Sequence, residues 1–159
     1  MSKTTRGTQV LGKAKVAFTL HPYEYNPAGE RVGLQAAEAM QADPQIVLKT
    51  LMAEVDGHPV CVVVPSDGEV SMKKLAAAFG GKSAQMMKPP DAERLTGYHV
   101  GGISPFGQKK RVPTVVESDA LAHPLVYING GQRGLLVRLA PADAVAVLGA
   151  VVASVMSEG

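Results

Sequence analysis

The chain has 159 residues, of which 46% are hydrophobic and 19% are charged, so it can bury a core and suits a single domain over residues 1–159. Sixteen Lys and Arg against 14 Asp and Glu leave a formal net charge of +2. This excludes a surface of uniform sign, and any nucleic-acid contact has to come from a local basic patch.

The N-terminal part of the chain alternates helical and extended patterns. Apolar residues at helical spacing predict a helix within 7–18, and the alternation in FTLHPYEY predicts a strand within 18–25. Good helix formers then predict a helix over 32–40 that closes before Asp43-Pro44.

A hairpin and a helix follow. The apolar runs at 46–55 and 59–65 flank Asp56-Gly57, a strong turn signal, and predict two paired strands. The next segment, 71–81, predicts a helix with Ser71 as its N-cap.

The C-terminal part also alternates helical and extended patterns. A short helix is expected at 91–97, strands at 113–118, 125–129 and 135–139, and a final helix over 141–155 with Pro in its first turn. Hairpins with interspersed helices indicate an α+β domain with a mixed sheet rather than a regular βαβ array.

No segment predicts export or membrane insertion. No apolar run follows the basic N-terminal residues, and the longest apolar segment, 144–155, is too short and too rich in Gly and Ala to span a bilayer. We therefore expect a cytoplasmic protein. The single cysteine, Cys61, excludes an internal disulfide, and its apolar run PVCVVVP favours inert packing over a reactive thiolate.

Common catalytic and cofactor motifs are absent from the sequence. The histidines have neither HExxH spacing nor cysteine or carboxylate companions at ligand intervals, which predicts no metal; they are His21, His58, His99 and His123. GGISPFG lacks the register of a phosphate-binding loop, and no GxSxG or dinucleotide motif occurs, so no cofactor is expected.

Lys49 is a cation within the apolar segment QIVLKTL. Its stem can lie along the strand while its ammonium reaches solvent. The functional interpretation is a partly desolvated ammonium that meets a carbonyl or phosphate oxygen.

Two glycine-rich segments and one basic run are the other candidates. Gly101-Gly102-Ile103-Ser104-Pro105 can be an ordinary loop or a loop that approaches a ligand closely, and Gly130-Gly131-Gln132-Arg133-Gly134 allows a tight hairpin or a ligand loop. The run of Lys109, Lys110 and Arg111 is a solvated turn or a phosphate contact.

Together these segments resemble the YbaK/EbsC family of aminoacyl-tRNA deacylases. HPYEYNP, VLKTL, TGYHVGGISPFGQKKRVPT and YINGGQRGL follow the family's order at its approximate spacings, over nearly the whole chain. The amino-acid sequence of the long central motif most resembles the subgroup that hydrolyses Cys-tRNA(Pro). The resemblance implies a mixed, curved, barrel-like sheet surrounded by helices, a fold also found as the editing insertion of bacterial prolyl-tRNA synthetases.

The resemblance also implies roles for individual residues. Lys49 is the family's required lysine. Positions that match the substrate pocket are Tyr23, Val32, Thr50, Gly101, Gly102, Ile103, Ser104, Pro105, Asn129, Gly130 and Gly131. The cations placed to meet tRNA phosphates are Lys109, Lys110, Arg111 and Arg133. The chain departs from the Cys-specific subgroup at three positions: Val32 replaces an aromatic residue, Asn129 a serine and Leu136 an acidic residue.

The implied reaction needs no nucleophile from the protein, because the thiol of the substrate cysteine attacks its own ester carbonyl. The expected partners are aminoacyl-tRNA and, transiently, prolyl-tRNA synthetase. Two alternatives stay open: an enzyme that clears Ala-tRNA(Pro) or other esters with a bound water, and a non-catalytic module that binds tRNA or a synthetase. The sequence offers no convincing catalytic triad, which agrees with attack by the thiol of the substrate itself.

Overall fold

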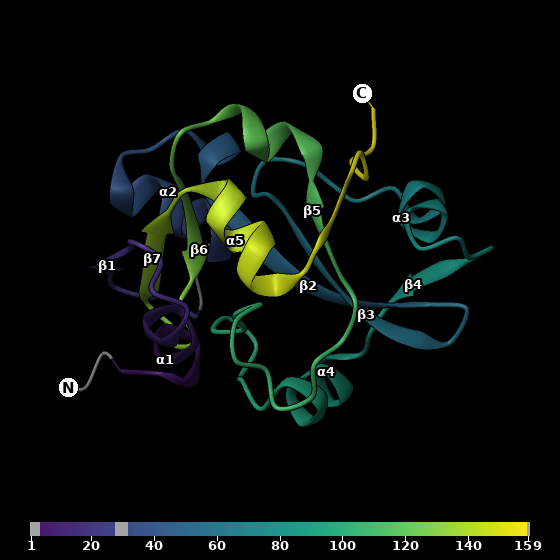
Figure 1. The fold of residues 1–159 in the computed structure, drawn as a ribbon, viewed down its shortest axis with the longest axis horizontal. Helices are drawn as coiled ribbons and strands as arrows, with labels where there is room; N and C mark the ends of the chain where they lie inside the picture. The colour runs from purple at the N-terminus through teal and green to yellow at the C-terminus, as the bar shows by residue number, and fades with distance from the viewer. Residues whose placement is uncertain (1–3, 28–31, 159) are drawn as a thin grey trace.

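The computed structural model describes residues 4–27 and 32–158, and these form two β-sheets with helices around them (Figure 1). The helices are α1 (Arg6–Lys13), α2 (Val32–Met40), α3 (Met72–Ala78), α4 (Pro89–Thr96) and α5 (Pro141–Leu148), with two short 3₁₀ turns, η1 (Pro44–Ile46) and η2 (Ser118–Ala122). The strands are β1 (Thr19–Pro22), β2 (Leu48–Val55), β3 (His58–Pro65), β4 (Ala84–Met86), β5 (Thr114–Glu117), β6 (Val126–Asn129), β7 (Leu135–Leu139) and β8 (Val151–Ala153).

The larger sheet has the strand order β4-β2-β3-β5-β8, and the smaller one the order β1-β7-β6. The smaller sheet is antiparallel, whereas the larger one pairs β3 with β5 and β5 with β8 in parallel. The predicted α+β class with a mixed sheet is thus confirmed. A parallel bridge between Val47 and Tyr127 links the sheets, but the described strands do not close into a barrel, since β4 and β8 end the larger sheet as edges.

Local signals account for most of these elements. The hairpin of β2 and β3 turns at Asp56 and Gly57, which both have positive φ. Ser71 caps α3, its hydroxyl accepting from the Lys74 N–H at 3.2 Å. The strands β6 and β7 pair across the second glycine segment as expected.

The last predicted helix is too long. We expected it to run over 141–155, but α5 ends before Gly149, whose φ of +60° makes a left-handed cap, and residues 151–153 form strand β8 beside β5. Val151 and Val152 are β-branched and suit this strand once an edge of the sheet is available to them. The short strand β4 was not predicted.

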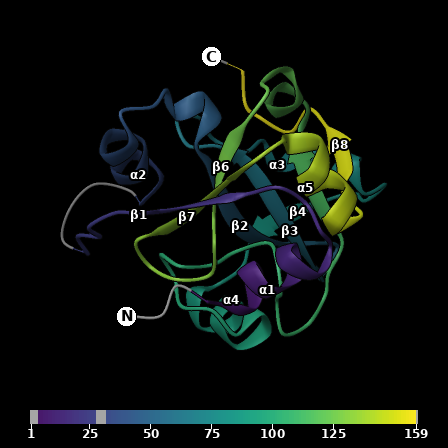
Figure 2. The same ribbon diagram turned by 60° about the vertical axis from the view of Figure 1, so that its left-hand side comes forward.

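The core lies between the sheets and under the helices. Its largest fully buried side chain is Phe106, which comes from the central glycine-rich motif. A second cluster packs under α3 and a third under α2. Figure 2 shows α1 and α4 at the same end of the molecule, where the Arg6 guanidinium donates to the Thr96 carbonyl at 3.3 Å. None of the described helices is long and apolar enough to cross a membrane.

Candidate active site

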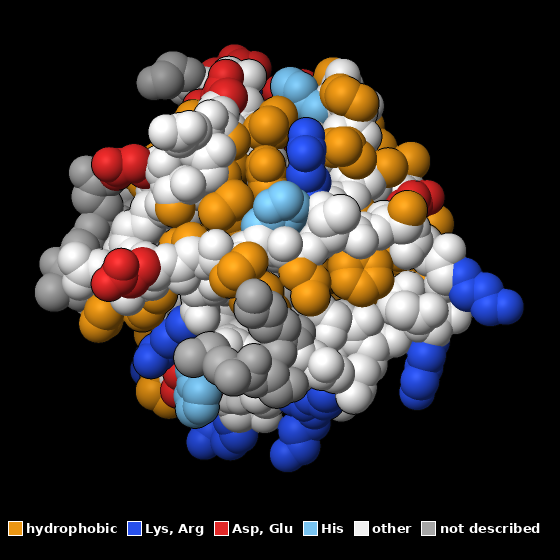
Figure 3. All heavy atoms as spheres, turned by 90° about the vertical axis from the view of Figure 1, so that its left-hand side faces the viewer, with side chains coloured by type: hydrophobic (Ala, Val, Ile, Leu, Met, Phe, Trp, Pro, Cys, Tyr) orange, Lys and Arg blue, Asp and Glu red, His pale blue; other side chains and the backbone are white. Residues whose placement is uncertain are grey.

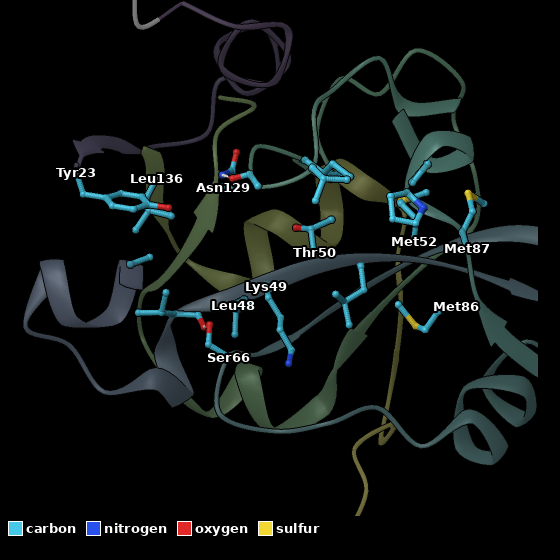
Figure 4. A pocket seen from close by; sticks show the side chains of 18 residues that line it. Tyr23, Leu48, Lys49, Thr50, Met52, Ser66, Met86, Met87, Asn129 and Leu136 are labelled. Carbon is cyan, nitrogen blue, oxygen red and sulfur yellow. Dashed lines mark hydrogen bonds between the residues drawn. The ribbon is translucent and has the colours of Figure 1, made fainter. Parts of the chain in front are cut away.

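A cavity of about 460 Å³ opens beside the first half of β2, where this strand has no partner on one side. Its walls come from the segment after β1, from α2, β2, β4, α4, β6 and β7, and from the central glycine loop (Figure 4). The lining residues are Tyr23, Ala36, Val47, Leu48, Lys49, Thr50, Leu51, Met52, Ser66, Met86, Met87, Pro89, Ala92, Val100, Gly101, Ile103, Asn129 and Leu136. Apolar groups thus form most of the walls, with a few polar atoms among them, as is typical of ligand sites.

Two buried hydroxyls in this cavity lack a hydrogen bond of good geometry within the described part of the chain. Tyr23 Oη and Thr50 Oγ1 are inaccessible to solvent, and neither makes a hydrogen bond of good geometry to any described residue. Burial and, to a smaller extent, the nearby Tyr25 raise the pKa of Tyr23, so its hydroxyl keeps its proton. Buried polar groups are normally satisfied, so these two hydroxyls are candidate contacts for a bound molecule.

Lys49 borders the same cavity from the other side of the strand. Because side chains alternate along a strand, Lys49 and Thr50 point to opposite sides of β2 (Figure 4). Lys49 is half-buried, and its Nζ donates to the Gly68 carbonyl at 2.7 Å in the loop after β3. The ammonium is therefore held by a backbone carbonyl at the edge of the sheet.

The two glycine segments pack against each other. A Cβ on Gly102 would lie 2.6 Å from the Arg133 N, and a Cβ on Gly101, whose φ is +94°, would lie 2.8 Å from Tyr25 Oη. Asn129 joins the segments, because its Nδ2 donates to the Gly101 and Gln132 carbonyls, both at 3.3 Å. The glycines are required here for close packing.

Most of the backbone N–H groups expected to face a ligand are already used. Gly102 N donates to the His99 carbonyl at 2.8 Å, Gly130 N to the Leu135 carbonyl at 3.0 Å, and Gly131 N to Asn129 Oδ1 at 2.6 Å. These three amides hold the loops in shape and are not free to donate to a ligand.

The remaining predicted pocket residues divide into two groups. Tyr23, Lys49, Thr50, Gly101, Ile103 and Asn129 line the cavity, whereas Gly102, Ser104, Pro105, Gly130 and Gly131 are not among its lining residues. Ser104 is fully buried, and its hydroxyl accepts from the Phe106 N–H at 3.1 Å. Val32 begins α2, but its side chain lies outside the described part of the structure.

The predicted phosphate-binding cations do not form one cluster. Lys109 and Lys110 are exposed beside a separate groove of about 500 Å³. The Arg111 guanidinium instead donates to the Leu148 carbonyl at 3.2 Å, at the end of α5, and Arg133 Nε donates to the Val100 carbonyl at 2.9 Å. On the face shown in Figure 3, Lys and Arg side chains gather mostly toward the lower edge, and acidic side chains toward the top and left.

Sequence reasoning missed part of the cavity wall. Ala36, Ser66 and Met86 come from three separate segments, and no motif marks them. The Ser66 hydroxyl donates to the Val47 carbonyl, so it is a structural contact. Leu136, noted as a departure from the Cys-specific subgroup, contributes an apolar side chain to the wall.

Cys61 and the histidines lie outside the cavity lining. Cys61 is fully buried in the core, and burial raises the pKa of its thiol to about 12. Across residues 4–27 and 32–158, no three His, Cys, Asp or Glu side chains come together as a metal site.

Comparison with known proteins identifies the family. The family model described as "Aminoacyl-tRNA editing domain" matches residues 31–147. The chain is 32% identical over 139 residues to the Enterococcus faecalis protein described as "Putative Cys-tRNA(Pro)/Cys-tRNA(Cys) deacylase EbsC", covering 86% of this chain and 84% of that protein. It is 28% identical over 106 residues to the proline–tRNA ligase of Geobacillus kaustophilus, covering 67% of this chain but 18% of the ligase.

A solved structure agrees with this match over the whole fold. It is the crystal structure described as that of "a putative trans-editing enzyme for prolyl tRNA synthetase", which superposes with a TM-score of 0.81 at 26% identity and covers 100% of this chain and 99% of that one. The family match, the relative and the shared fold give one answer: the chain belongs to the aminoacyl-tRNA editing domain family.

Proposed function

We propose that the chain is a trans-editing hydrolase that removes cysteine from mischarged Cys-tRNA(Pro) in the cytoplasm and so protects the fidelity of translation. The observation that carries this proposal is the cavity beside β2, with the unpartnered hydroxyls of Tyr23 and Thr50 among apolar walls. Membership of the editing-domain family supports cleavage of an aminoacyl ester, and the description of the Enterococcus relative supports cysteine as the amino acid.

The polar atoms of the cavity supply positioning and charge stabilisation. Tyr23 Oη and Thr50 Oγ1 bind the ester and the terminal ribose, and the ammonium of Lys49 orients the aminoacyl-adenosine end from the sheet edge. The N–H groups of Gly102, Gly130 and Gly131 are engaged internally. The developing oxyanion is therefore assigned to the Gly101 N–H together with the two hydroxyls.

The nucleophile is the thiol of the substrate. Its sulfur attacks the ester carbonyl, the bond from the carbonyl carbon to the ribose oxygen breaks, and that oxygen takes up the thiol proton. The products are free tRNA and a cyclic thiolactone, which water opens to cysteine. This route agrees with the described cavity lining, which includes no cysteine, histidine or carboxylate.

A panel of esters on one tRNA tests the reaction. Cys-tRNA(Pro), Ser-tRNA(Pro) and Ala-tRNA(Pro) are incubated with the protein, and the released amino acid and any thiolactone are measured. We expect fast cleavage of the cysteine ester and much slower cleavage of the other two. The serine and alanine esters should still inhibit competitively, because a change of one atom alters binding in an apolar pocket by only about 1–3 kcal/mol. Comparable rates for cysteine and alanine without a trapped thiolactone would exclude the thiol route.

One observation favours a second candidate of the same class. Leu136 makes the wall apolar where the Cys-specific subgroup carries an acidic residue, which suits a small aliphatic side chain such as that of alanine. An Ala-tRNA(Pro) or broader deacylase would then use a bound water, and the same panel separates it. A non-catalytic tRNA- or synthetase-binding module would bind all three esters and cleave none.

The partner in the cell is mischarged aminoacyl-tRNA, with prolyl-tRNA synthetase as a transient companion that selects tRNA(Pro). Lys109 and Lys110 provide an exposed cation pair for tRNA phosphates beside the second groove. Arg111 and Arg133 are each tied to a backbone carbonyl, so we expect smaller contributions from them.

A further inference from the structure

The position of the Lys49 ammonium depends on a loop that the C-terminal segment holds in place. Lys49 Nζ donates to the carbonyl of Gly68, in the loop between β3 and α3. A lysine side chain has many rotamers, and a fixed acceptor restricts them. Whatever fixes the Gly68 carbonyl therefore also restricts the ammonium.

The loop is joined to the C-terminal segment over residues 155–157. Ser71 N donates to the Val155 carbonyl and Ser157 N to the Glu69 carbonyl, both at 2.8 Å, and Val70 and Met156 form an isolated antiparallel bridge. Gly68 itself touches Met156, because a Cβ at Gly68 would lie 2.3 Å from the Met156 methyl carbon. In Figure 1 the C-terminal segment runs on from β8 toward this loop.

Glu117, at the end of β5, holds that segment from the other side. Its Oε1 accepts from the Val155 N–H at 2.8 Å and the Met156 N–H at 3.2 Å. Its Oε2 accepts from the Asp119 N–H at 3.0 Å and the Ser118 hydroxyl at 3.1 Å. The residue is 1% exposed, so a charged group is buried here with four hydrogen-bond donors around it.

We infer that Glu117 is a positioning residue for Lys49. Its carboxylate anchors residues 155 and 156, these hold the loop at 68–71, and the Gly68 carbonyl sets the place of the ammonium. This inference rests on the proposed role of Lys49 in ester cleavage. It assigns a function in the reaction to a residue outside the lining of the cavity.

A double-mutant cycle tests the inference. Glu117→Met removes both acceptor oxygens at similar side-chain length, and Ser118→Ala is the matched control, because it removes one donor to Oε2 and leaves both C-terminal contacts intact. We expect Glu117→Met to lower the single-turnover deacylation rate about tenfold with little change in KM, and Ser118→Ala to keep the wild-type rate. In the Lys49→Ala background, Glu117→Met should have no further effect.

If Glu117→Met lowers the rate by the same factor with and without Lys49, the residue acts independently of the ammonium and the inference is wrong. Should thermal unfolding show that Glu117→Met does not fold, Met156→Ala takes its place in the cycle, since it removes the side chain that contacts Gly68.

A second readout is independent of activity. The ¹⁵N signal of the Lys49 ammonium, identified by its loss in Lys49→Ala, should shift or broaden in Glu117→Met and stay in place in Ser118→Ala. An unchanged signal in Glu117→Met overturns the inference. If the wild-type protein cleaves none of the esters, the proposed function fails, while this signal still tests the link between Glu117 and Lys49.

Discussion

Thr50→Val should make the protein more stable and less active. The Thr50 hydroxyl is buried without a hydrogen bond of good geometry to any described residue, and an unsatisfied buried polar group costs about 1–3 kcal/mol. Valine has a similar shape and suits a strand equally well. We therefore expect the free energy of unfolding to rise by about 1 kcal/mol, which corresponds to an increase in Tm of about 2–4 °C for a chain of this size.

Activity should change in the opposite direction. If the hydroxyl binds the ester or ribose, its removal costs one hydrogen bond, and kcat/KM should fall about tenfold, equivalent to about 1.4 kcal/mol. The assays are thermal unfolding of the free protein and deacylation of Cys-tRNA(Pro) under single-turnover conditions.

Thr114→Val is the matched control for this prediction. Thr114 is likewise a strand residue and is buried, but its hydroxyl donates to the Val112 carbonyl at 3.2 Å. Its replacement should lower the free energy of unfolding by about 1 kcal/mol and leave the deacylation rate unchanged. Destabilisation by Thr50→Val similar to that of the control, or wild-type activity in Thr50→Val, would refute the assignment of Thr50 to the ligand site.

Lys49→Ala should fold normally, as judged by its Tm, and lose deacylation by more than about a hundredfold, the scale for one oriented electrostatic group; near wild-type rates would contradict its role. Chelator treatment should not change the rate, and Cys61→Ser should be nearly as active as the wild type, because the thiol is buried and its pKa is about 12; a stoichiometric metal in the purified protein would contradict this. Replacing Lys109 and Lys110 with Gln should weaken tRNA binding and flatten its salt dependence, with less effect at saturating substrate; an unchanged salt slope would exclude phosphate contact. Glu117 gives a prediction about pH. Burial by itself raises the pKa of its carboxyl, but hydrogen bonds from the backbone and Ser118 outweigh burial and hold this pKa below its usual value. The ionised Glu117 carboxylate therefore stabilises the folded state fully above the unfolded-state pKa, about 4.3, and this stabilisation is lost as pH falls through the lower folded-state pKa. Glu117→Gln should therefore make Tm decrease less steeply with acid in this range.

Local chemistry in the sequence determined most of the elements. Helical spacing, the cap at Ser71 and the turn at Asp56-Gly57 are set by neighbouring residues, and each predicts the structure found there. The same local reasoning extended the last helix to residue 155, because its apolar residues suit a helix or a strand equally well. Only the free edge of β5 decides for a strand over 151–153.

The tertiary structure decided which residues line the cavity and which residues support them. The sequence motifs pointed to Tyr23, Lys49 and Thr50, but the contacts of Lys49 with Gly68 and of Glu117 with Val155 join segments that lie 19 and 38 residues apart in the chain. Cations that are adjacent in the sequence also lie in different surroundings, because the Arg111 side chain reaches the Leu148 carbonyl at the end of α5 whereas Lys110 does not. Periodicity and turn chemistry act over a few residues, whereas a cavity and its supports depend on which strands pair and in what register, and that is fixed only when the core packs.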